Sequence, residues 1–427
     1  MASINIRELA ADTLIEILER GQFSHLYLKA VLDKYSYLEK NERAFLTRLV
    51  NGTVERKIEL DYIIDSYSKT KAKKMKPWIR TSLRMGVFEI YYMDSVPDSA
   101  TCNEYVKLAK KRGFAGLSGF VNGVLRSIAR DKGNLKIEDS AIRYSIPDWL
   151  CDMWTKQYGK DKAVEIMDGF FKDESLCIRV DLNKISREDL AQSLKAQGIS
   201  VTISNEIESA MYIANYDSIA SIPEFGQGLF YVQDYSSQLI PYLAHVKEDE
   251  DILDLCSAPG GKALHAAMIA KNGHVMARDL TEYKVGLIRE NIARAGADNI
   301  QAQVCDARVF DENSREKYNL VIADLPCSGL GIIRKKPDIK YNQTPESLKE
   351  LALLQKQILD NAAEYVCPGG RLSYSTCTIN KDENENQVED FLSSHKEFVV
   401  EEMRQLLPDT KHDGFFICVM KKQTLGH

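Results

Sequence analysis

The stretch DILDLCSAPGGKALH, residues 251–265, sets a short apolar segment before a Pro-Gly-Gly turn and a segment typical of a helix. A buried strand that runs into a glycine turn and opens a helix brings backbone N–H groups close to a ligand. The dinucleotide fingerprint GxGxxG and the phosphate loop GxxxxGK[ST] are both absent from the sequence, which disfavours NAD and ATP. A nucleoside cofactor that carries a carboxylate or a positive sulfur remains open.

The order of strand, loop and helix repeats after this stretch. Further strand-like segments are HVMARDL (274–280), IQAQVCDA (300–307), YNLVIADLP (318–326) and RLSYSTC (371–377), with helix-like segments between them. This alternation is typical of a doubly wound α/β domain with a mainly parallel sheet. We therefore predict a Rossmann-like α/β domain over residues 241–427.

The rest of the chain divides by its periodicity. Apolar residues recur at helical spacing through most of residues 1–133, which predicts an all-α domain, and residues 134–170 are expected to form a helical linker. Residues 171–240 alternate between strand-like LCIRVDL, ISVTISN and GLFYVQD and a helix that Ser186 caps, which predicts a small α+β unit similar to an RNA recognition motif. Its strands could face RNA or could simply extend the next domain.

Composition is that of an ordinary globular protein of two or three domains, with 427 residues of which 44% are hydrophobic. No apolar run is long enough to span a membrane, and Arg7, Glu8 and Asp12 stand where a signal peptide would be uncharged, so we expect a cytoplasmic protein. Nine scattered cysteines without CxxC pairs favour free thiols and no metal site. We expect a monomer.

Basic residues gather locally although the net charge is −6. No acid interrupts Lys69–Arg84, and a second basic group follows it. Such a patch could bind RNA phosphates or could be an ordinary solvated helical face. The candidate RNA-binding residues are Lys73, Lys74, Lys76, Arg80, Lys110, Lys111 and Arg112.

Four acids stand at the ends of successive strand-like segments, namely Asp254, Asp279, Asp306 and Asp324. In doubly wound nucleoside sites, an acid at the second strand accepts hydrogen bonds from ribose hydroxyls. We therefore place Asp279 at a ribose, Asp306 near an adenine, and Asp254 and Asp324 near the reacting centre. Any one of these acids could cap a helix or turn, but four at corresponding positions favour a site for S-adenosylmethionine.

Two cysteines are predicted to reach the same edge of the sheet, Cys327 in ADLPCSGLG and Cys377 in STCT. A free cysteine is often only a small core residue. Two thiols beside a cofactor suit methylation at pyrimidine C5, because a thiolate that adds to C6 makes C5 nucleophilic. Methylation of an exocyclic amine needs no such step. The residues alone do not decide which thiol attacks.

At this point the sequence resembles the RsmB (Fmu/Sun) family of 16S ribosomal RNA cytosine-C5 methyltransferases over nearly its whole length. The segments that match the family's methyltransferase motifs are DLCSAPGGK, DLPCSGLG, RKKPDIK, CPGGRLSYSTCT and DGFF, and YVQDYSSQL matches the segment that leads into that domain. The segments NERAFLTRLVNGTVERKIELD, RMGVFEIYYMDSVP and GFVNGVLR resemble a NusB-like RNA-binding domain. The resemblance implies a NusB-like domain, an RNA-binding α+β subdomain and a class I methyltransferase domain dependent on S-adenosylmethionine.

Carried over by motif position, the resemblance implies that Cys377 attacks cytosine C6, that Cys327 assists product release and that Asp324 holds the cytosine edge. It places the cofactor against Asp279, Asp306, Asp324 and the loop Cys256, Ser257, Ala258, Pro259, Gly260, Gly261 and Lys262. The sequence departs from the family at Tyr341, where tryptophan is usual after PDIK, and at Ser257, where alanine is common. The implied partner is small-subunit ribosomal RNA.

Two other functions are compatible with the sequence. The same chemistry could act on transfer RNA or on another ribosomal cytosine, since the motifs would look alike. A non-catalytic RNA-binding assembly factor could also keep this fold, but it would have no need of both thiols, the glycine loop and the strand-end acids.

Overall fold

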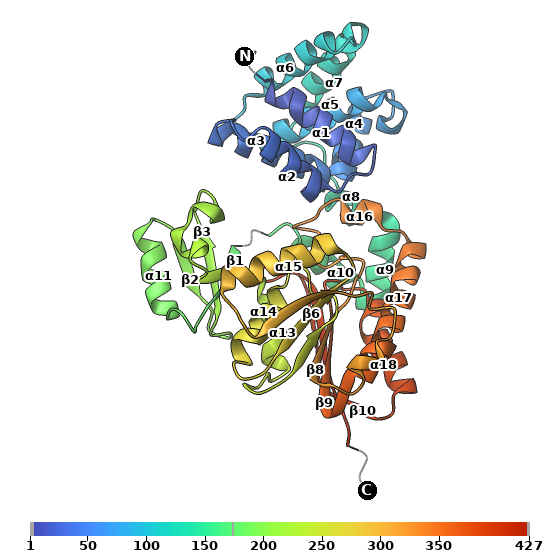
Figure 1. Cartoon of the computed structure of the whole chain (residues 1–427). Coiled ribbons are helices and arrows are strands. Elements are labelled where there is room, and N and C mark those ends of the chain that lie inside the picture. Colours follow the sequence, from blue (N-terminus) through green and yellow to red (C-terminus); the bar gives the residue numbers. More distant parts are fainter. Residues whose placement is uncertain (1–3, 173–174, 425–427) are drawn as a thin grey trace. The chain divides into compact units, whose positions relative to one another are not determined.

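The computed structural model describes residues 4–172 and 175–424 and contains two compact units (Figure 1). The helical unit comprises the chain up to Phe171 together with Ile333–Gln343, and the sheet unit comprises Lys172–Ile332 and Thr344 onward. In the described part of the chain, no helix combines the length and apolar character needed to cross a bilayer. Over the same residues, no group of three or more His, Cys, Asp or Glu side chains is arranged to hold a metal ion.

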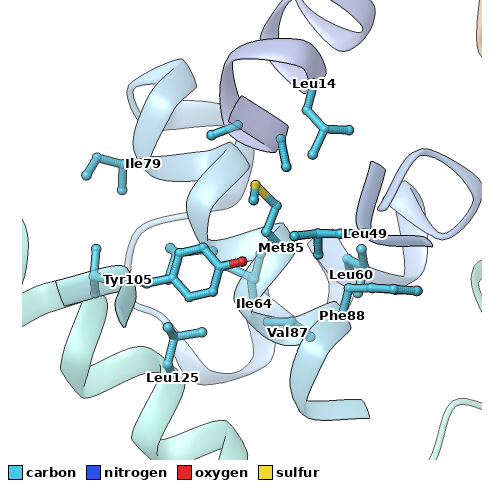
Figure 2. Packing of buried hydrophobic residues seen from close by; sticks show 14 of the residues in the cluster. Leu14, Leu49, Leu60, Ile64, Ile79, Met85, Val87, Phe88, Tyr105 and Leu125 are labelled. Carbon is cyan, nitrogen blue, oxygen red and sulfur yellow. The ribbon is translucent and has the colours of Figure 1, made fainter. Parts of the chain in front are cut away.

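The helical unit confirms the helical periodicity of the sequence. Its helices are α1 (Ile6–Leu18), α2 (Ser24–Lys34), α3 (Lys40–Glu55), α4 (Lys57–Tyr67), α5 (Pro77–Tyr92), α6 (Asp98–Lys111), α7 (Ser118–Arg130), α8 (Ser140–Arg143), α9 (Asp148–Tyr158), α10 (Lys160–Gly169) and α16 (Ile339–Asn342), with short 3₁₀ turns η1 (Ala72–Lys74) and η2 (Ala115–Leu117). Helix α5 is central, because nearly every residue from Trp78 to Ile90 is buried. Leu14, Leu49, Ile64 and Leu125 pack around it from the surrounding helices (Figure 2).

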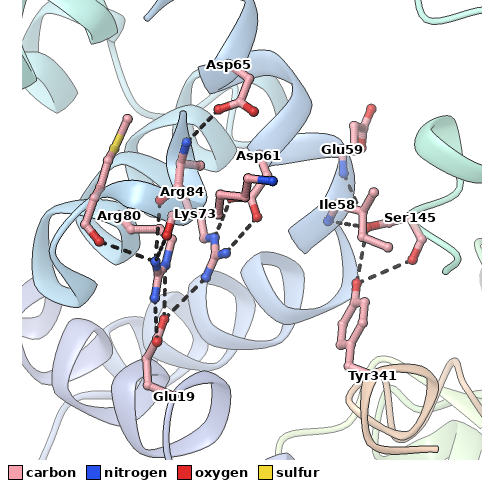
Figure 3. A network of polar contacts seen from close by, with 12 residues as sticks. Glu19, Ile58, Glu59, Asp61, Asp65, Lys73, Arg80, Arg84, Ser145 and Tyr341 are labelled. Carbon is pink, nitrogen blue, oxygen red and sulfur yellow. Dashed lines mark hydrogen bonds and ion pairs between the residues drawn. The ribbon is translucent and has the colours of Figure 1, made fainter. Parts of the chain in front are cut away.

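The segment Ile333–Gln343 joins the helical unit, although it follows the Cys327 motif in the chain. Asp338 accepts hydrogen bonds from the backbone N–H and hydroxyl of Ser24, at the start of α2. The fully buried Lys340 donates to the carbonyl of Glu55 at 2.7 Å, and burial lowers the pKa of its ammonium to about 7. The Tyr341 hydroxyl lies 3.1 Å from the hydroxyl of Ser145 (Figure 3), so this residue is tied into the helical unit.

A small antiparallel sheet opens the sheet unit, in the order β2-β3-β1-β4 within the described residues. Its elements are β1 (Leu176–Val180), α11 (Arg187–Ala196), β2 (Ser200–Ile203), β3 (Ala210–Ala214), η3 (Ile219–Ser221), α12 (Pro223–Gly226) and β4 (Phe230–Val232). The predicted strands and the helix are confirmed, and Ser186 caps α11 by accepting a hydrogen bond from the Asp189 N–H. The sequence analysis missed β3, which pairs with both β1 and β2.

The large sheet has the order β10-β11-β9-β8-β5-β6-β7 in the part of the chain that is described. Its elements, with the helices around them, are α13 (Tyr235–Leu243), β5 (Ile252–Asp254), α14 (Gly261–Ile269), β6 (Val275–Asp279), α15 (Glu282–Ala295), β7 (Ile300–Val304), η4 (Glu312–Ser314), β8 (Tyr318–Asp324), α17 (Pro345–Tyr365), β9 (Val366–Thr376), η5 (Lys381–Glu383), α18 (Glu385–Ser394), β10 (Phe398–Leu406) and β11 (Phe415–Lys422). Strands β5 to β9 run parallel to one another, as predicted. Strands β10 and β11 add an antiparallel edge that the sequence analysis did not anticipate.

Helices cover both faces of this sheet, and strand β8 shows how. Leu320 and Ile322 belong to a core with residues of α13, α14 and α15, whereas Val321 and Ala323 belong to a core with residues of α17 and α18. Alternate side chains of a strand point to opposite faces, so a strand covered on both sides must be apolar throughout. Because β5, β6, β8 and β9 run parallel to one another, their carboxyl ends share one edge of the sheet. This edge holds the candidate site.

Candidate active site

The glycine turn after β5 is held by the neighbouring strand and helix. Gly260 has φ = 100°, a left-handed conformation that favours glycine, and α14 begins at the next residue. The Ala258 N–H donates to Asp279 Oδ2 at 2.9 Å, and the Asn291 side chain donates to the Pro259 carbonyl at 2.9 Å. The predicted loop from Cys256 to Lys262 thus lies against Asp279, at the end of β6.

Asp254 ends strand β5 and is completely buried. Neither oxygen of its carboxylate forms a hydrogen bond of normal geometry among the described residues, although the Ser257 hydroxyl lies close enough to lower its pKa. Burial, opposed by the positive charge of Lys262, raises the pKa of this carboxyl group to about 7. A buried carboxylate without a hydrogen-bond donor is costly, so a cation bound here would stabilise its charged form.

Lys262 links the glycine loop to the end of β8. Its Nζ lies 2.6 Å from Asp324 Oδ2, and Ser375 on β9 donates to Asp324 Oδ1 at 2.7 Å. Burial alone would lower the pKa of Lys262, but Asp324 and Asp254 raise it above its usual value. Lys262 therefore remains a cation, and Asp324 is held by two elements.

The two predicted thiols meet at this edge. Cys327 Sγ and Cys377 Sγ are 3.3 Å apart. The contact with Cys377, burial, and the negative charges of Glu383 and Asp324 all raise the pKa of Cys327 well above its usual value. Cys327 is therefore held as the neutral thiol. Lys262 lies within electrostatic range of Cys377.

The sequence analysis missed Glu383, a fully buried residue that joins the two cysteine loops. Its carboxylate accepts hydrogen bonds from the Ser328 N–H at 2.8 Å and the Ser328 hydroxyl at 2.6 Å, beside Cys327. It also accepts from Asn380 at 3.1 Å, in the Cys377 loop, and from Gln355 of α17 at 3.0 Å. Glu383 lies in the acid–amide run NKDENENQ, which follows the predicted strand RLSYSTC closely, so an acid just after this strand end was a usable signal.

Gly331 brings a third loop to the same place. Its N–H donates to the Cys377 carbonyl at 3.0 Å, and its carbonyl accepts from the Gly414 N–H at 2.9 Å. A Cβ at Gly331 would overlap the backbone of Gly414, so only glycine permits this approach. The DGFF motif therefore packs directly against the loops that carry the two thiols.

Asp306 stands apart from this cluster. It lies beyond β7, where its carboxylate forms a 2.6 Å ion pair with Arg308. Its side chain retains 29% exposure, so it is accessible to a ligand at the edge of the sheet.

The predicted RNA-binding residues lie on the helical unit and differ in their surroundings. Lys73, Lys74, Lys76 and Lys110 are exposed. Arg80 pairs with Glu19 at 2.5 Å (Figure 3), Lys111 pairs with Glu8 at 2.5 Å, and Arg112 pairs with Asp12.

Solved structures resemble the chain over most of its length. The crystal structure of PH0851 is 26% identical in sequence, with a TM-score of 0.82, and the match covers 98% of this chain and 99% of that one. A methyltransferase homologue protein from Pyrococcus horikoshii is 27% identical, with a TM-score of 0.60, over 66% of this chain and 98% of its own. The fold and the site together define a Rossmann-like methyltransferase.

Sequence comparisons identify the family. Residues 241–421 match the family described as 16S rRNA methyltransferase RsmB/F, residues 4–130 match the NusB family, and residues 146–220 match the ferredoxin-like domain of RsmF/B-like methyltransferases. The probable ribosomal RNA small subunit methyltransferase B of Bacillus subtilis (strain 168) is 36% identical, over 99% of this chain and 100% of its own. The corresponding protein of Proteus mirabilis is 31% identical, over 99% of both chains. The chain belongs to the RsmB/F methyltransferase family, with a NusB-like helical domain and a ferredoxin-like subdomain.

Proposed function

We propose that this protein transfers the methyl group of S-adenosylmethionine to C5 of a cytosine in small-subunit ribosomal RNA. The observation that carries the proposal is the pair of thiols, with Cys327 Sγ 3.3 Å from Cys377 Sγ, beside the Lys262–Asp324 ion pair. Cytosine C5 reacts only after a nucleophile has added to C6, which requires a thiol at the site. The names of the curated relatives support ribosomal RNA as the substrate.

The residues at this edge fit the proposed donor. S-adenosylmethionine supplies, when bound, a methyl group on a positively charged sulfur. The backbone of Cys256–Lys262 would hold it, with Asp279 at the ribose and Asp306 near the adenine. The buried, unpartnered carboxylate of Asp254 suits a ligand with a positive charge.

In the proposed reaction, the Cys377 thiolate forms a bond to C6 of a cytosine flipped out of its stack. The electron pair of the C5–C6 double bond moves to C5 and makes this carbon nucleophilic. The donor, when bound, would supply the methyl group to C5, and its sulfur would keep the electron pair of the carbon–sulfur bond that breaks. Asp324 holds the polar edge of the ring beside N3, where its carboxylate can accept a hydrogen bond from the exocyclic amino group, and Lys262 fixes Asp324 through their ion pair. These residues orient the ring, so the attack needs little reorganisation.

Product release then reverses the addition. The C5–H bond breaks with its proton passing to water, its electron pair restores the C5–C6 double bond, and the sulfur–C6 bond breaks to return the Cys377 thiolate. Cys327 lies beside the leaving sulfur as a neutral thiol, so it can donate a hydrogen bond to the departing thiolate.

The function is tested by methylation with labelled S-adenosylmethionine on small-subunit RNA and on total transfer RNA, followed by digestion to nucleosides. We expect label in 5-methylcytidine from small-subunit RNA only. Label in transfer RNA would assign the same chemistry to another substrate. Label on a different atom would refute the thiol mechanism, and no label in either RNA would favour a non-catalytic assembly factor.

The buried Asp254 makes donor affinity depend on pH. Its pKa of about 7 means that the free protein binds a proton there at lower pH. A cationic donor favours the carboxylate, so donor binding releases this proton and affinity rises with pH. From the proton-binding equilibrium, we expect donor affinity to be about tenfold higher at about pH 8 than at about pH 6, measured by titration calorimetry.

The Asp254→Asn variant is the control for this effect, since asparagine keeps the size of the side chain but does not titrate. Its affinity for the donor should be lower at about pH 8 and almost constant over the same range. The donor's own amino group titrates near pH 8, and this contribution is common to both proteins. Equal pH dependence in the two proteins would remove Asp254 from the donor site.

Replacing Glu383 by glutamine should slow methyl transfer, because the amide NH₂ cannot accept the two hydrogen bonds that one carboxylate oxygen now accepts and would face donors of Ser328, Asn380 or Gln355. The two cysteine loops would then lose their common anchor. We expect the single-turnover rate to fall about 10- to 100-fold, with donor affinity unchanged, because misplacement of reacting groups mainly affects the chemical step.

The matched control is Glu250→Gln. Glu250 is also buried and accepts from Arg371, but it precedes β5 and so lies at the opposite end of that strand from the site. Both variants should lower the unfolding temperature, and only Glu383→Gln should lower the single-turnover rate. An equal loss of rate in the two variants would show that Glu383 has only a structural role.

A further inference from the structure

The sheet unit contains a cavity that lies outside the residues used in the proposed reaction. It has a volume of about 430 Å³, within the range of about 300–1,000 Å³ that is usual for small-ligand sites. Ser204 and Glu206 line it from the loop that follows β2 in the small sheet. Asp409 and His412 line it from the loop between β10 and β11 of the large sheet. The cavity therefore lies where the two sheets meet.

Aromatic rings from three elements line this cavity. They are Tyr212 from β3, Tyr235 from α13 and His412 from the loop between β10 and β11. The rings of Tyr235 and His412 are stacked, with their centroids 6.0 Å apart and their planes at 22°. Tyr212 and His412 are half-buried, so each retains exposed surface. Aromatic side chains, histidine included, are the surfaces on which unpaired RNA bases stack, because every base has a flat π-face.

The charged groups of the lining are balanced in sign. Glu206 and Asp409 are acids, and the ammonium group of Lys411 lies 3.9 Å from the Glu206 carboxylate. The Tyr235 hydroxyl also donates a hydrogen bond to Glu206. Two carboxylates repel a phosphate, but a carboxylate accepts hydrogen bonds from the amino and ring N–H groups of a base. The lining therefore suits a nucleobase better than a phosphate.

Both loops that form the cavity are held by their own side chains. The N–H groups of Glu206 and Ile207 donate to the Ser204 hydroxyl at 3.2 and 3.3 Å. The N–H groups of Lys411 and His412 donate to Asp409 Oδ1 at 2.7 and 3.0 Å. A cavity with walls that are already ordered loses little conformational entropy when a ligand binds.

The loop that carries His412 also reaches the catalytic edge. Gly414 lies two residues further along the chain, and its N–H donates to the Gly331 carbonyl at 2.9 Å. The Gly331 N–H in turn donates to the carbonyl of Cys377 at 3.0 Å. Tyr235 and Cys377 also pack in the same hydrophobic core. A base near the target cytosine is therefore the part of the RNA that can reach this cavity.

We propose that this cavity binds an unpaired base of the substrate RNA, close in sequence to the target cytosine, by stacking it on Tyr212 and His412. The choice of RNA rests on the proposed function. The choice of a base rests on the three aromatic rings and the balanced charge of the lining. A base bound here selects RNA that is single-stranded beside the target, because a paired base cannot enter the cavity.

The test is a mutant cycle between the protein and the RNA. The full-length wild type and its Tyr212→Leu variant are titrated, without donor, against a small-subunit RNA fragment chosen for tight binding to the wild type. The same fragment then carries an abasic site at each unpaired position in turn, and fluorescence anisotropy measures binding. Leucine keeps the apolar contact of Tyr212 with the core but removes the flat ring.

We expect the Tyr212→Leu variant to bind the intact fragment about tenfold more weakly than the wild type does. One abasic position should weaken the wild type by the same factor and leave the variant almost unchanged, because the two changes remove the same contact. The loss should also be equal at all salt concentrations, since stacking releases no counterions. A loss that shrinks as salt rises would show a phosphate contact instead and would overturn the proposal.

The matched control is Tyr242→Leu, since Tyr242 also lies on α13, is 57% exposed and does not line the cavity. It should bind like the wild type, and an equal loss in this variant would contradict the proposal. So would the lack of any abasic position that acts through Tyr212. Thermal unfolding checks the fold of each variant, and His412→Leu repeats the test from a separate loop.

Methylation of the same RNA is measured separately. Binding that depends on the cavity, without methylation, would refute only the proposed function. Methylation by the wild type, with unchanged RNA binding in both the Tyr212→Leu and His412→Leu variants, would refute only the base site.

Discussion

Alanine at Cys377 should abolish methyl transfer, whereas alanine at Cys327 should leave the protein covalently attached to its RNA. The first change removes the atom that bonds to C6, so we expect the rate to fall by more than about 10⁴-fold, as for other lost nucleophiles. The second change removes the thiol that lies 3.3 Å from the leaving sulfur, so release should become slow. Denaturing gels with labelled RNA detect the adduct.

The control is Cys367→Ala. Cys367 is also a free cysteine, but it lies at the start of β9, whereas Cys377 directly follows the end of that strand. It should retain full activity and show no adduct. An adduct that forms with Cys377→Ala and not with Cys327→Ala would show that Cys327 attacks C6 and that Cys377 assists release. Full activity of both Cys377→Ala and Cys327→Ala would show that the two cysteines are only small core residues.

Asparagine at Asp324 is expected to have the next largest effect. This change leaves the partly buried Lys262 cation without its ion-pair partner and removes the charge that we place at the cytosine edge. An unpaired buried charge is costly, and the loss of an oriented group at a reacting centre typically lowers the rate about 10²- to 10³-fold. The measurement is the single-turnover rate with saturating donor.

The Ser375→Ala variant separates the effect of the Asp324 charge from the effect of the hydrogen bond that holds Asp324 in place. It removes only the 2.7 Å hydrogen bond to Asp324 Oδ1 and keeps the ion pair with Lys262. We expect a loss of about tenfold, at the lower end for one donor to a charged acceptor, because the ion pair with Lys262 remains. A Ser375→Ala effect as large as that of Asp324→Asn would show that position, rather than charge, is what Asp324 contributes.

The parallel part of the large sheet could be predicted because its strands are covered on both faces. Strand β8, YNLVIAD, is apolar at consecutive positions and is bounded by turn residues, so its pattern is clear in the sequence. Strand β10, FVVEEMRQL, is mostly exposed at an edge and carries charged residues, so it lacks this signal. Strand β10 was therefore missed for a physical reason, whereas β11, FFICVMKK, is apolar and buried, so its pattern in the sequence was usable.

The candidate site shows the same division. The meeting of Cys327, Cys377, Asp254 and Asp324 at one sheet edge could be predicted, because each lies at the end of a strand or within three residues after it and the alternation of elements fixes the strand directions. Glu383 could not, because its role depends on contacts with Ser328, 55 residues away in the chain. The ion pair between Arg80 and Glu19 joins residues that are 61 positions apart in the chain, so the sequence pattern could not predict it either.

The segment Ile333–Gln343 has a consequence for the way this protein can be taken apart. The chain passes between the two units after Phe171, after Ile332 and again after Gln343, so a single cut does not separate them. A truncation that removes residues 1–133 would leave Asp338 and Lys340 without the Ser24 and Glu55 groups that they bind. The helical unit is thus not a detachable module, and a shortened chain would lose stability together with any RNA affinity.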